Sequence, residues 1–215
     1  MSARLVAFAA VPLALVVSLL TAAPAHASAI YAYQGNLFTS LTIDINGPGP
    51  VDFYAFTDRV TGFMELASPL AADLNSLTTL APVAFSFSDG VNTITHATAT
   101  VSSFAVVTND VGAIVQWYVF VSAFAPADGG GTVRNISTSS NVSLQVQDGV
   151  LDRLCGPTST SQGCVLGGTP YYTQTAGNAD APGAWTLRTP VPEPSSMLLI
   201  GVALAGFAAR RRVRR

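Results

Sequence analysis

Lysine is absent from this 215-residue chain, and charged residues of all kinds make up only 10% of it, against roughly 25% in an average soluble protein. Arginine alone supplies the positive charge, and five of the ten arginines lie within the last six residues. Residues 28–190 hold eleven acidic side chains and four arginines, a formal charge of −7. Such a body repels phosphate and has no basic patch to displace counterions, so we exclude nucleic-acid binding by it.

Histidine is also scarce, and His96 is the only one beyond the N-terminal apolar segment. A Ser-His-Asp hydrolase would depend on this residue, but it lies in a threonine-rich run and the chain has no G-x-S-x-G sequence. We therefore expect a solvent-facing histidine on a strand. One histidine and two cysteines are also too few to predict a zinc site, and no cofactor is expected.

The chain contains only two cysteines, Cys155 and Cys164, which lie nine positions apart in the loop-like stretch CGPTSTSQGC. In an exported protein such a pair is predicted to form a disulfide. Closing a loop of this size would stabilise the fold by roughly 2.5 to 3 kcal/mol in the chain-entropy model. The alternative is a pair of free thiols.

The acidic side chains of the body form no recognisable catalytic or metal-binding motif. Several precede glycine, as in Asp89-Gly90, Asp128-Gly129 and Asp148-Gly149, which favours turns over a pair of glycosidase carboxylates. Asp44-Ile45-Asn46-Gly47 is similar to the start of a calcium loop, but the remaining ligands, including the bidentate glutamate, are missing. We predict neither catalysis nor a metal site from these residues.

Residues 1–27 have the pattern of a secretory signal peptide. Arg4 provides the positive charge, Leu5–Leu20 an apolar core, and Ala25-His26-Ala27 the small-x-small cleavage pattern, with Ala25 and Ala27 as the small residues. Cleavage after Ala29 and an uncleaved N-terminal anchor are the alternatives. In each case the body is expected to leave the cytoplasm.

The C-terminal segment 189–215 combines three elements of different chemistry. Val191-Pro192-Glu193-Pro194-Ser195 contains two prolines, which favour an extended backbone. Residues 196–209 are uncharged and mostly apolar; as a helix, Met197–Ala209 would measure only about 20 Å, short of the ~30 Å hydrocarbon core. The arginines that follow are expected to stay in the cytoplasm; they are Arg210, Arg211, Arg212, Arg214 and Arg215. The segment is therefore predicted to be a marginal transmembrane anchor.

These last 25 residues closely resemble the PEP-CTERM sorting signal, with the Pro-Glu-Pro motif, the short apolar helix and the arginine-rich end in the same order. The resemblance implies recognition and cleavage by an exosortase, a membrane-embedded cysteine transpeptidase of Gram-negative bacteria. It also implies transient anchoring in the inner membrane, a final location at the cell surface or outside the cell, and a link with exopolysaccharide and biofilm. The alternative is an ordinary membrane anchor with a chance Pro-Glu-Pro.

Residues 28–188 are predicted to form a single all-β domain, an antiparallel β-sandwich of about eight strands, because short alternating runs are bounded by turn residues. We expect one hairpin of Val83–Ser88 and Val91–Ala97 around a two-residue Asp89-Gly90 turn, with Ile94 opposite Phe85. A second hairpin should join Val101–Thr108 to Ala113–Phe124. The remaining strands are expected at Tyr31–Tyr33, Val60–Leu66, Val142–Gln147 and Trp185–Leu187. One or two helical turns are expected within Leu70–Leu80.

Within the second hairpin, Trp117, Val119 and Val121 should share one face with Ala123, while the other face is also apolar. A strand with two apolar faces is typical of the interior of a sheet.

Three functions remain open for the body. The first is a non-enzymatic surface or matrix protein. The second is a carbohydrate-binding module for the cell's own exopolysaccharide, in which Trp117, Tyr118, Tyr171 or Tyr172 would stack on sugar rings, unless these aromatics are core residues. The third, a secreted hydrolase, requires a cleft with converging polar groups. We favour the first.

Overall fold

The computed structural model describes residues 28–45, 52–127, 130–140, 147–155, 172–179 and 181–188. Within these ranges all regular structure is extended, in twelve strands that belong to one compact unit, Ser28–Pro190. The strands are β1 (Ala29–Leu37), β2 (Ser40–Ile45), β3 (Arg59–Leu66), β4 (Thr78–Thr79), β5 (Ala84–Ser88), β6 (Thr93–Thr95), β7 (Val101–Thr108), β8 (Ile114–Ala127), β9 (Gly130–Ser139), β10 (Gln147–Cys155), β11 (Tyr172–Ala179) and β12 (Ala184–Arg188).

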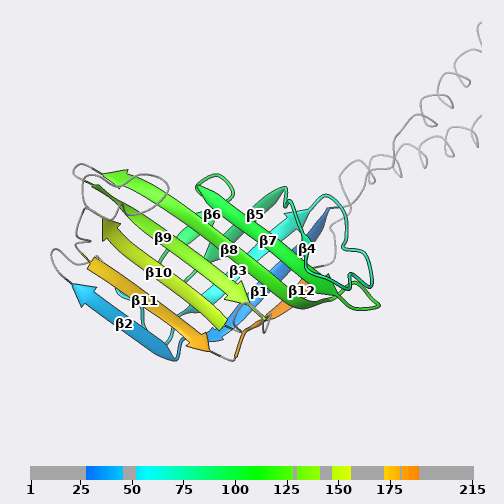
Figure 1. Ribbon diagram of the computed structural model, residues 1–215, viewed down its shortest axis with the longest axis horizontal. Coiled ribbons are helices and arrows are strands. Elements are labelled where there is room, and N and C mark those ends of the chain that lie inside the picture. The colour runs from blue at the N-terminus through cyan, green and yellow to red at the C-terminus, as the bar shows by residue number, and fades with distance from the viewer. Residues whose placement is uncertain are drawn as a thin grey trace, which may run out of the picture. The chain divides into compact units, whose positions relative to one another are not determined.

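The strands form two antiparallel sheets, which confirms the all-β prediction. One sheet has five strands in the order β12-β1-β3-β5-β6, and the other has seven in the order β2-β11-β10-β9-β8-β7-β4. The seven-stranded sheet lies in front in Figure 1, with the five-stranded sheet behind it. The expected count of about eight strands was too low, because β2, β4, β9, β10 and β11 were not among the predicted strands. The strand expected at Val142–Gln147 lies outside the described residues except for Gln147, where β10 begins.

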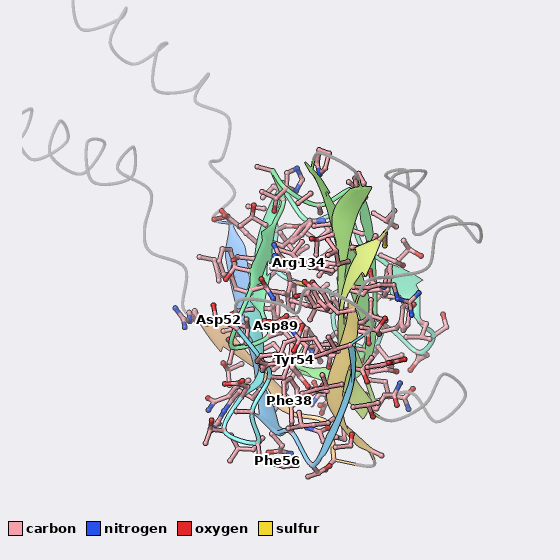
Figure 2. The ribbon with its side chains drawn as sticks, turned by 90° about the vertical axis from the view of Figure 1, so that its left-hand side faces the viewer. Phe38, Asp52, Tyr54, Phe56, Asp89 and Arg134 are labelled. Carbon is pink, nitrogen blue, oxygen red and sulfur yellow. The ribbon has the colours of Figure 1, made fainter. Side chains whose placement is uncertain are left out.

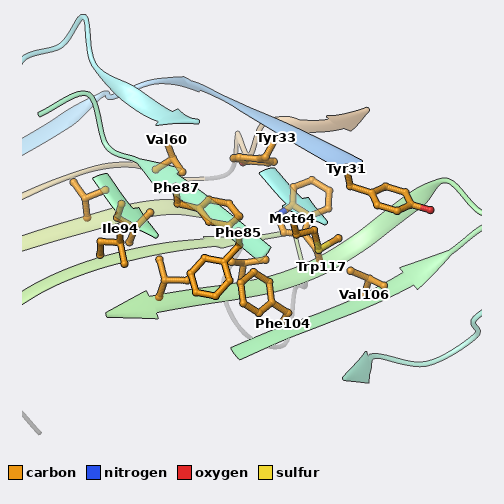
Figure 3. Close-up of a cluster of buried hydrophobic side chains, with 14 of the residues drawn as sticks. Tyr31, Tyr33, Val60, Met64, Phe85, Phe87, Ile94, Phe104, Val106 and Trp117 are labelled. Carbon is orange, nitrogen blue, oxygen red and sulfur yellow. The ribbon is translucent and has the colours of Figure 1, made fainter. Parts of the chain in front are cut away.

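Side chains from both sheets form a single hydrophobic cluster (Figure 3). On β8 the buried residues alternate, as predicted, at Trp117, Val119 and Val121. The Trp117 ring packs edge to face against Tyr33 of the opposite sheet, with 5.8 Å between ring centroids. Phe85 and Phe104 also contact each other between the sheets, in a tilted arrangement with 5.0 Å between ring centroids. This shared core holds the two sheets together through their inward faces.

The hairpin of β7 and β8 forms as expected, with Phe104 opposite Val119 in its register. β8 also pairs with β9, so it lies in the interior of its sheet. The β5–β6 hairpin exists too, but its predicted register was wrong: Ile94 pairs with Phe87, not with Phe85. The reason is a four-residue connection in which the Asp89 carboxylate accepts the backbone N–H groups of Val91 and Asn92. Gly90 supplies the positive φ of +97° that this turn requires.

The helical turns expected within Leu70–Leu80 are absent from this described segment, which instead contains strand β4. The segment is tied to the end of β7, where the hydroxyl of Thr108 donates to the carbonyl of Ala71 and accepts the N–H of Leu74. Among the described residues, no helix has the length and apolar character needed to cross a membrane. The expected signal helix and C-terminal helix lie outside these residues.

Candidate functional site

Polar side chains fill part of the space between the sheets, next to the hydrophobic cluster. Along β10 the inward positions are Asp148, Val150 and Asp152, and the two carboxylates are only 1% and 3% exposed. β11 directs Gln174 and Asn178 inward in the same way. Because successive strand residues face opposite sides, the spacing of two places all of these polar groups on the buried face. Buried polar groups of this kind need partners.

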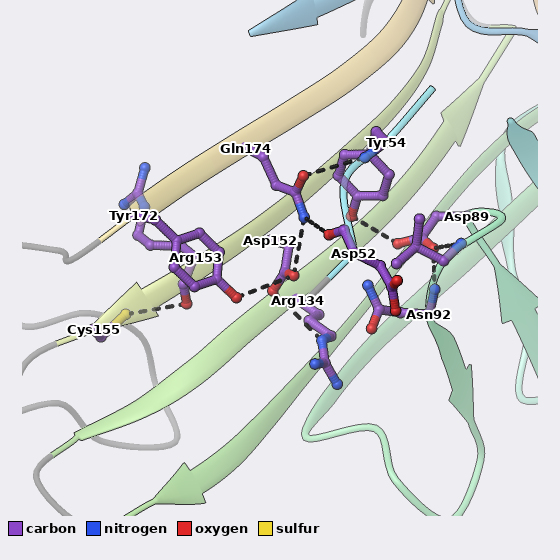
Figure 4. Close-up of polar contacts among 11 residues, drawn as sticks. Asp52, Tyr54, Asp89, Asn92, Arg134, Asp152, Arg153, Cys155, Tyr172 and Gln174 are labelled. Atoms are coloured by element: carbon purple, nitrogen blue, oxygen red, sulfur yellow. Dashed lines mark hydrogen bonds and ion pairs between the residues drawn. The ribbon is translucent and has the colours of Figure 1, made fainter. Parts of the chain in front are cut away.

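Asp152 lies at the centre of the first polar group (Figure 4). Its Oδ2 accepts hydrogen bonds of 3.3 Å from the Tyr172 hydroxyl and from the Gln174 amide. Its Oδ1 lies 3.5 Å from Nε of Arg134, whose side chain is 37% exposed. The pairing of β10 with β9 places Asp152 directly opposite Arg134. The carboxylate is therefore compensated from both neighbouring strands of its own sheet.

Residues 52–58 extend this group toward the other sheet. The Gln174 amide also donates to the carbonyl of Asp52, and its oxygen accepts the N–H of Tyr54. The Tyr54 hydroxyl donates to Oδ2 of Asp89 at 2.8 Å. Figure 2 shows Tyr54, Asp89 and Arg134 lying between the two sheets. Through Tyr54, the polar group connects β11 to the β5–β6 turn.

The second polar group centres on Tyr33 of β1. Its hydroxyl donates to Oδ1 of Asp148 at 2.6 Å and accepts the N–H of Gly183 at 2.7 Å. It thus joins the five-stranded sheet to β10 and to the residues that lead into β12. A side chain at position 183 would not fit, because its Cβ would lie 2.0 Å from the carbonyl oxygen of Gln34.

Burial raises the pKa values of acidic side chains in both polar groups. Desolvation raises the pKa of Asp148, and the hydrogen bond from Tyr33 offsets only part of this effect. Desolvation also raises the pKa of Asp152, against the opposing charge of Arg134. The pKa of Tyr172 rises to about 12 through burial and the charge of Asp152. Burial and the neighbouring carboxylates raise the pKa values of Tyr33 and Tyr54 as well, so all three tyrosines remain hydrogen-bond donors at neutral pH.

The raised pKa of Asp148 predicts a stability that depends on pH. Between the unfolded pKa, about 3.9, and the higher folded value, the native state keeps a proton that the unfolded state releases, so the free energy of unfolding falls as pH rises. Each unit by which the folded pKa exceeds the unfolded one corresponds to about 1.4 kcal/mol. Asp148→Asn cannot ionise, so we expect its free energy of unfolding to fall less across this range.

Urea unfolding of the wild type and Asp148→Asn between about pH 4 and pH 8 measures this difference. Asp110→Asn is the control, because Asp110 lies exposed in the turn between β7 and β8. It should retain the pH dependence of the wild type. Equal slopes for the wild type and Asp148→Asn would show that Asp148 does not titrate with a raised pKa.

The chemical capacity of the two groups is limited. They contain carboxylates, phenols, amides and one guanidinium, but no histidine, cysteine or serine that would supply a nucleophile and its base. Asp89, Asp148 and Asp152 are each at most 3% exposed, so the carboxylates are closed to a substrate. Among the described residues, no three His, Cys, Asp or Glu side chains are placed to hold a metal ion. The arrangement acts as a hydrogen-bonded brace between the sheets.

Several residues considered from the sequence have clear positions. His96 is exposed, as expected, but it lies in the turn just after β6 and not on a strand; its ring packs edge to face against Phe85. The turn predicted at Asp148-Gly149 is wrong, because both residues lie within β10. Asp128-Gly129 lies outside the described residues. Asp44, considered for calcium, belongs to β2.

Two of the four aromatic residues considered for sugar stacking lie in the core. Trp117 and Tyr172 are buried at 5% and 6% exposure, where Trp117 donates to Thr138 and Tyr172 to Asp152. Tyr118 is half-buried, and Tyr171 lies outside the described residues. Of the two alternatives, core residues and a stacking surface, Trp117 and Tyr172 match the first.

Cys155 ends β10 and is buried. Cys164 lies outside the described residues, so the Cys155–Cys164 disulfide stays a prediction. The same holds for the signal-cleavage residues Ala25 and Ala27, for the motif 191–195, and for the arginines at 210–212, 214 and 215.

Comparison with known proteins bears on the C-terminal segment. A family model described as the PEP-CTERM protein-sorting motif matches residues 190–212. The match includes Val191–Ser195, the apolar run and Arg210–Arg212, and it confirms the resemblance inferred from the sequence. It implies an exported chain that an exosortase sorts and that is anchored in a membrane before processing. Neither a curated protein nor a solved structure matches the chain.

Proposed function

We propose that this chain is a non-enzymatic protein of the cell surface or extracellular matrix of a Gram-negative bacterium, delivered there by an exosortase. The observation that carries the proposal is the sorting-motif match at residues 190–212. In this proposal the body is a β-sandwich that is exported first, held briefly at the inner membrane by its C-terminal helix, and released when the exosortase cleaves near Pro192–Pro194. A link with exopolysaccharide and biofilm belongs to the same proposal.

Two features of the body support a non-enzymatic role. The polar groups between the sheets are engaged in bracing contacts, and their carboxylates are closed to solvent. The exposed His96 packs against Phe85, and no hydrogen bond joins its ring to a carboxylate or hydroxyl in the described part of the chain. A catalytic histidine requires such an orienting partner.

The apolar segment gives the tail its transient character. A helix of about 20 Å is too short to cross a bilayer without local thinning or the recruitment of flanking residues. It anchors the precursor weakly, while the arginine cluster prevents the C-terminus from following the body across the membrane. Such weak anchoring suits a precursor whose C-terminal anchor is later removed by an enzyme.

The mass of the mature protein from its native host tests this proposal. We expect a chain that has lost both residues 1–27 and the segment after the Pro-Glu-Pro motif, recovered from the outer surface or the medium. The control is the same protein from a strain without the exosortase, which should keep the C-terminal segment and remain in the membrane fraction. A mature protein that keeps Arg210–Arg215 in the native host would mean plain anchoring and not sorting.

A further inference from the structure

The outward face of the five-stranded sheet carries a groove of about 780 Å³. Two rows of residues that pair across the strands form its floor. One row runs through Thr186, Ala32, Phe63 and Ser86, and the next through Ala184, Gln34, Thr61, Ser88 and Thr93. With strands about 4.8 Å apart, the five strands make the floor roughly 19 Å across. The groove is therefore long enough for an extended chain molecule.

Small side chains make this face hollow. Ala32, Ser86 and Ser88 lie along the middle of the floor, where larger residues would fill the depression. Pro182 and Gly183 line one side of the groove, and the Asn36 amide donates to the carbonyls of Ala181 and Pro182 at 3.0 and 3.3 Å. The N–H of Gly183 is fixed by the buried Tyr33 hydroxyl. One of these contacts, from Gly183 to Tyr33, belongs to the polar group that braces the sheets.

Positive charge is concentrated in this groove. Arg59 and Arg188 line it, and no acidic residue does, although the body as a whole carries a charge of −7. Arg188 pairs with Ile30 and Arg59 with Leu37, so the two lie near opposite ends of β1, roughly 20 Å apart. In the described part of the chain the one ion pair is that of Arg134 with Asp152, so both groove arginines are available to a ligand.

Uncharged hydrogen-bonding groups lie between the arginines. The side chains of Gln34, Thr61, Ser86 and Thr93 make no hydrogen bond to any described residue. Amide and hydroxyl groups of this kind can both donate and accept, which suits the hydroxyl groups of a sugar. The half-buried Phe63 adds an aromatic ring to the same floor.

We propose that this groove binds an acidic oligosaccharide, a sugar chain that carries carboxylates, across the strands of the five-stranded sheet. Arg59 and Arg188 pair with two separate carboxylates, since guanidinium groups match carboxylate geometry. The side chains between them bind sugar hydroxyls, and Phe63 packs against a ring face. The proposal does not depend on the sorting motif.

An acidic peptide fits the groove less well. The groove crosses the face of the sheet, where the backbone N–H and C=O groups of the inner strands are already paired. Only its two ends reach the edge strands β12 and β6, so a peptide lying along the groove could not join the sheet as a further strand. Phe63 is the one large apolar side chain whose outward face lines the groove, and peptide recognition draws heavily on apolar anchor pockets. A neutral sugar would leave both arginines without partners.

The test uses the full chain, purified in a non-ionic detergent because of its apolar C-terminal run. Isothermal titration with oligogalacturonate should detect binding that weakens as salt is added. We expect Arg59→Gln with Arg188→Gln to lower the affinity at least about tenfold, because each substitution removes a charge-assisted hydrogen bond. Arg153→Gln is the matched control: Arg153 lies on β10 of the other sheet, where it donates to Thr173, and its variant should bind like the wild type.

A second variant keeps the test decisive if the double substitution unfolds the protein. Ala32→Phe fills the floor of the groove without changing charge and should also abolish binding, while circular dichroism verifies the fold. The proposal is overturned if the arginine variants bind like the wild type, or if Arg153→Gln loses as much affinity as they do. It is equally overturned if a neutral galacto-oligosaccharide or a short polyglutamate binds as tightly as oligogalacturonate.

Discussion

Replacing Pro192, Glu193 and Pro194 together by alanine is expected to abolish processing in cells that carry the exosortase. The variant chain should keep its C-terminal arginines and should remain in the membrane fraction. The two prolines hold this stretch extended, and each costs about 3 kcal/mol in a helix interior relative to alanine. Three alanines remove the two prolines that prevent helix formation, and they also remove Glu193, the single charged residue between Arg188 and Arg210. The apolar helix could then continue upstream, and the extended site presented to the enzyme would be lost.

Intact mass and membrane fractionation measure this outcome. Pro170→Ala is the control, because it replaces a proline of the same chain outside the matched residues 190–212, and it should be processed like the wild type. If the triple variant reaches the same location and the same mature mass as the wild type, the sorting function assigned to the tail is wrong.

The sequence predicted the strands whose inward residues are apolar. On β5 and β8, large apolar residues recur at every second position, as at Phe85 and Phe87 and at Trp117, Val119 and Val121, and this period of two is a local property that a sequence displays directly. The tail could be predicted for the same reason, since its prolines, apolar run and arginines are adjacent in the chain.

The sequence did not predict β10 and β11 because their buried residues are polar. Asp148 was predicted to lie in a turn with Gly149, and the polar residues Asp152, Gln174 and Asn178 interrupt the apolar alternation that marks a strand. Their burial depends on partners far away in the chain: the Tyr33 hydroxyl that pairs with Asp148 is 115 positions distant. Single-sequence patterns contain no information on such pairs. One local feature did indicate that Asp148 and Asp152 face the same side of a strand. They are four residues apart, with Val150 midway between them.

The β5–β6 register and the groove show two further limits. The length of the β5–β6 connection depends on which backbone N–H groups donate to the Asp89 carboxylate. An Asp-Gly pair is compatible with connections of two or four residues. The groove is formed by residues from five strands, and it becomes visible only when the register places Ala32, Ser86 and Ser88 in neighbouring rows.

Phe87→Ala is expected to have the largest effect on stability, because Phe87 links the shared core to the groove. Its ring is 0% exposed, and its centroid lies 6.1 Å from that of Phe104 and 6.2 Å from that of Trp185. Gly62 leaves room for the ring, since a Cβ there would lie 2.4 Å from it. The resulting cavity should lower the free energy of unfolding by about 3 to 5 kcal/mol, a large part of the 5 to 15 kcal/mol typical of a domain.

Thermal unfolding should therefore shift down by roughly 10 °C for a domain of this size. Val111→Ala is the matched control, because Val111 is 77% exposed and its loss should change the free energy by no more than about 0.5 kcal/mol. Equal effects of the two substitutions would mean that the sheets do not share a packed core. Since Ser86 and Ser88 extend from the opposite face of β5 into the groove, Phe87 also supports the floor on which the proposed oligosaccharide lies.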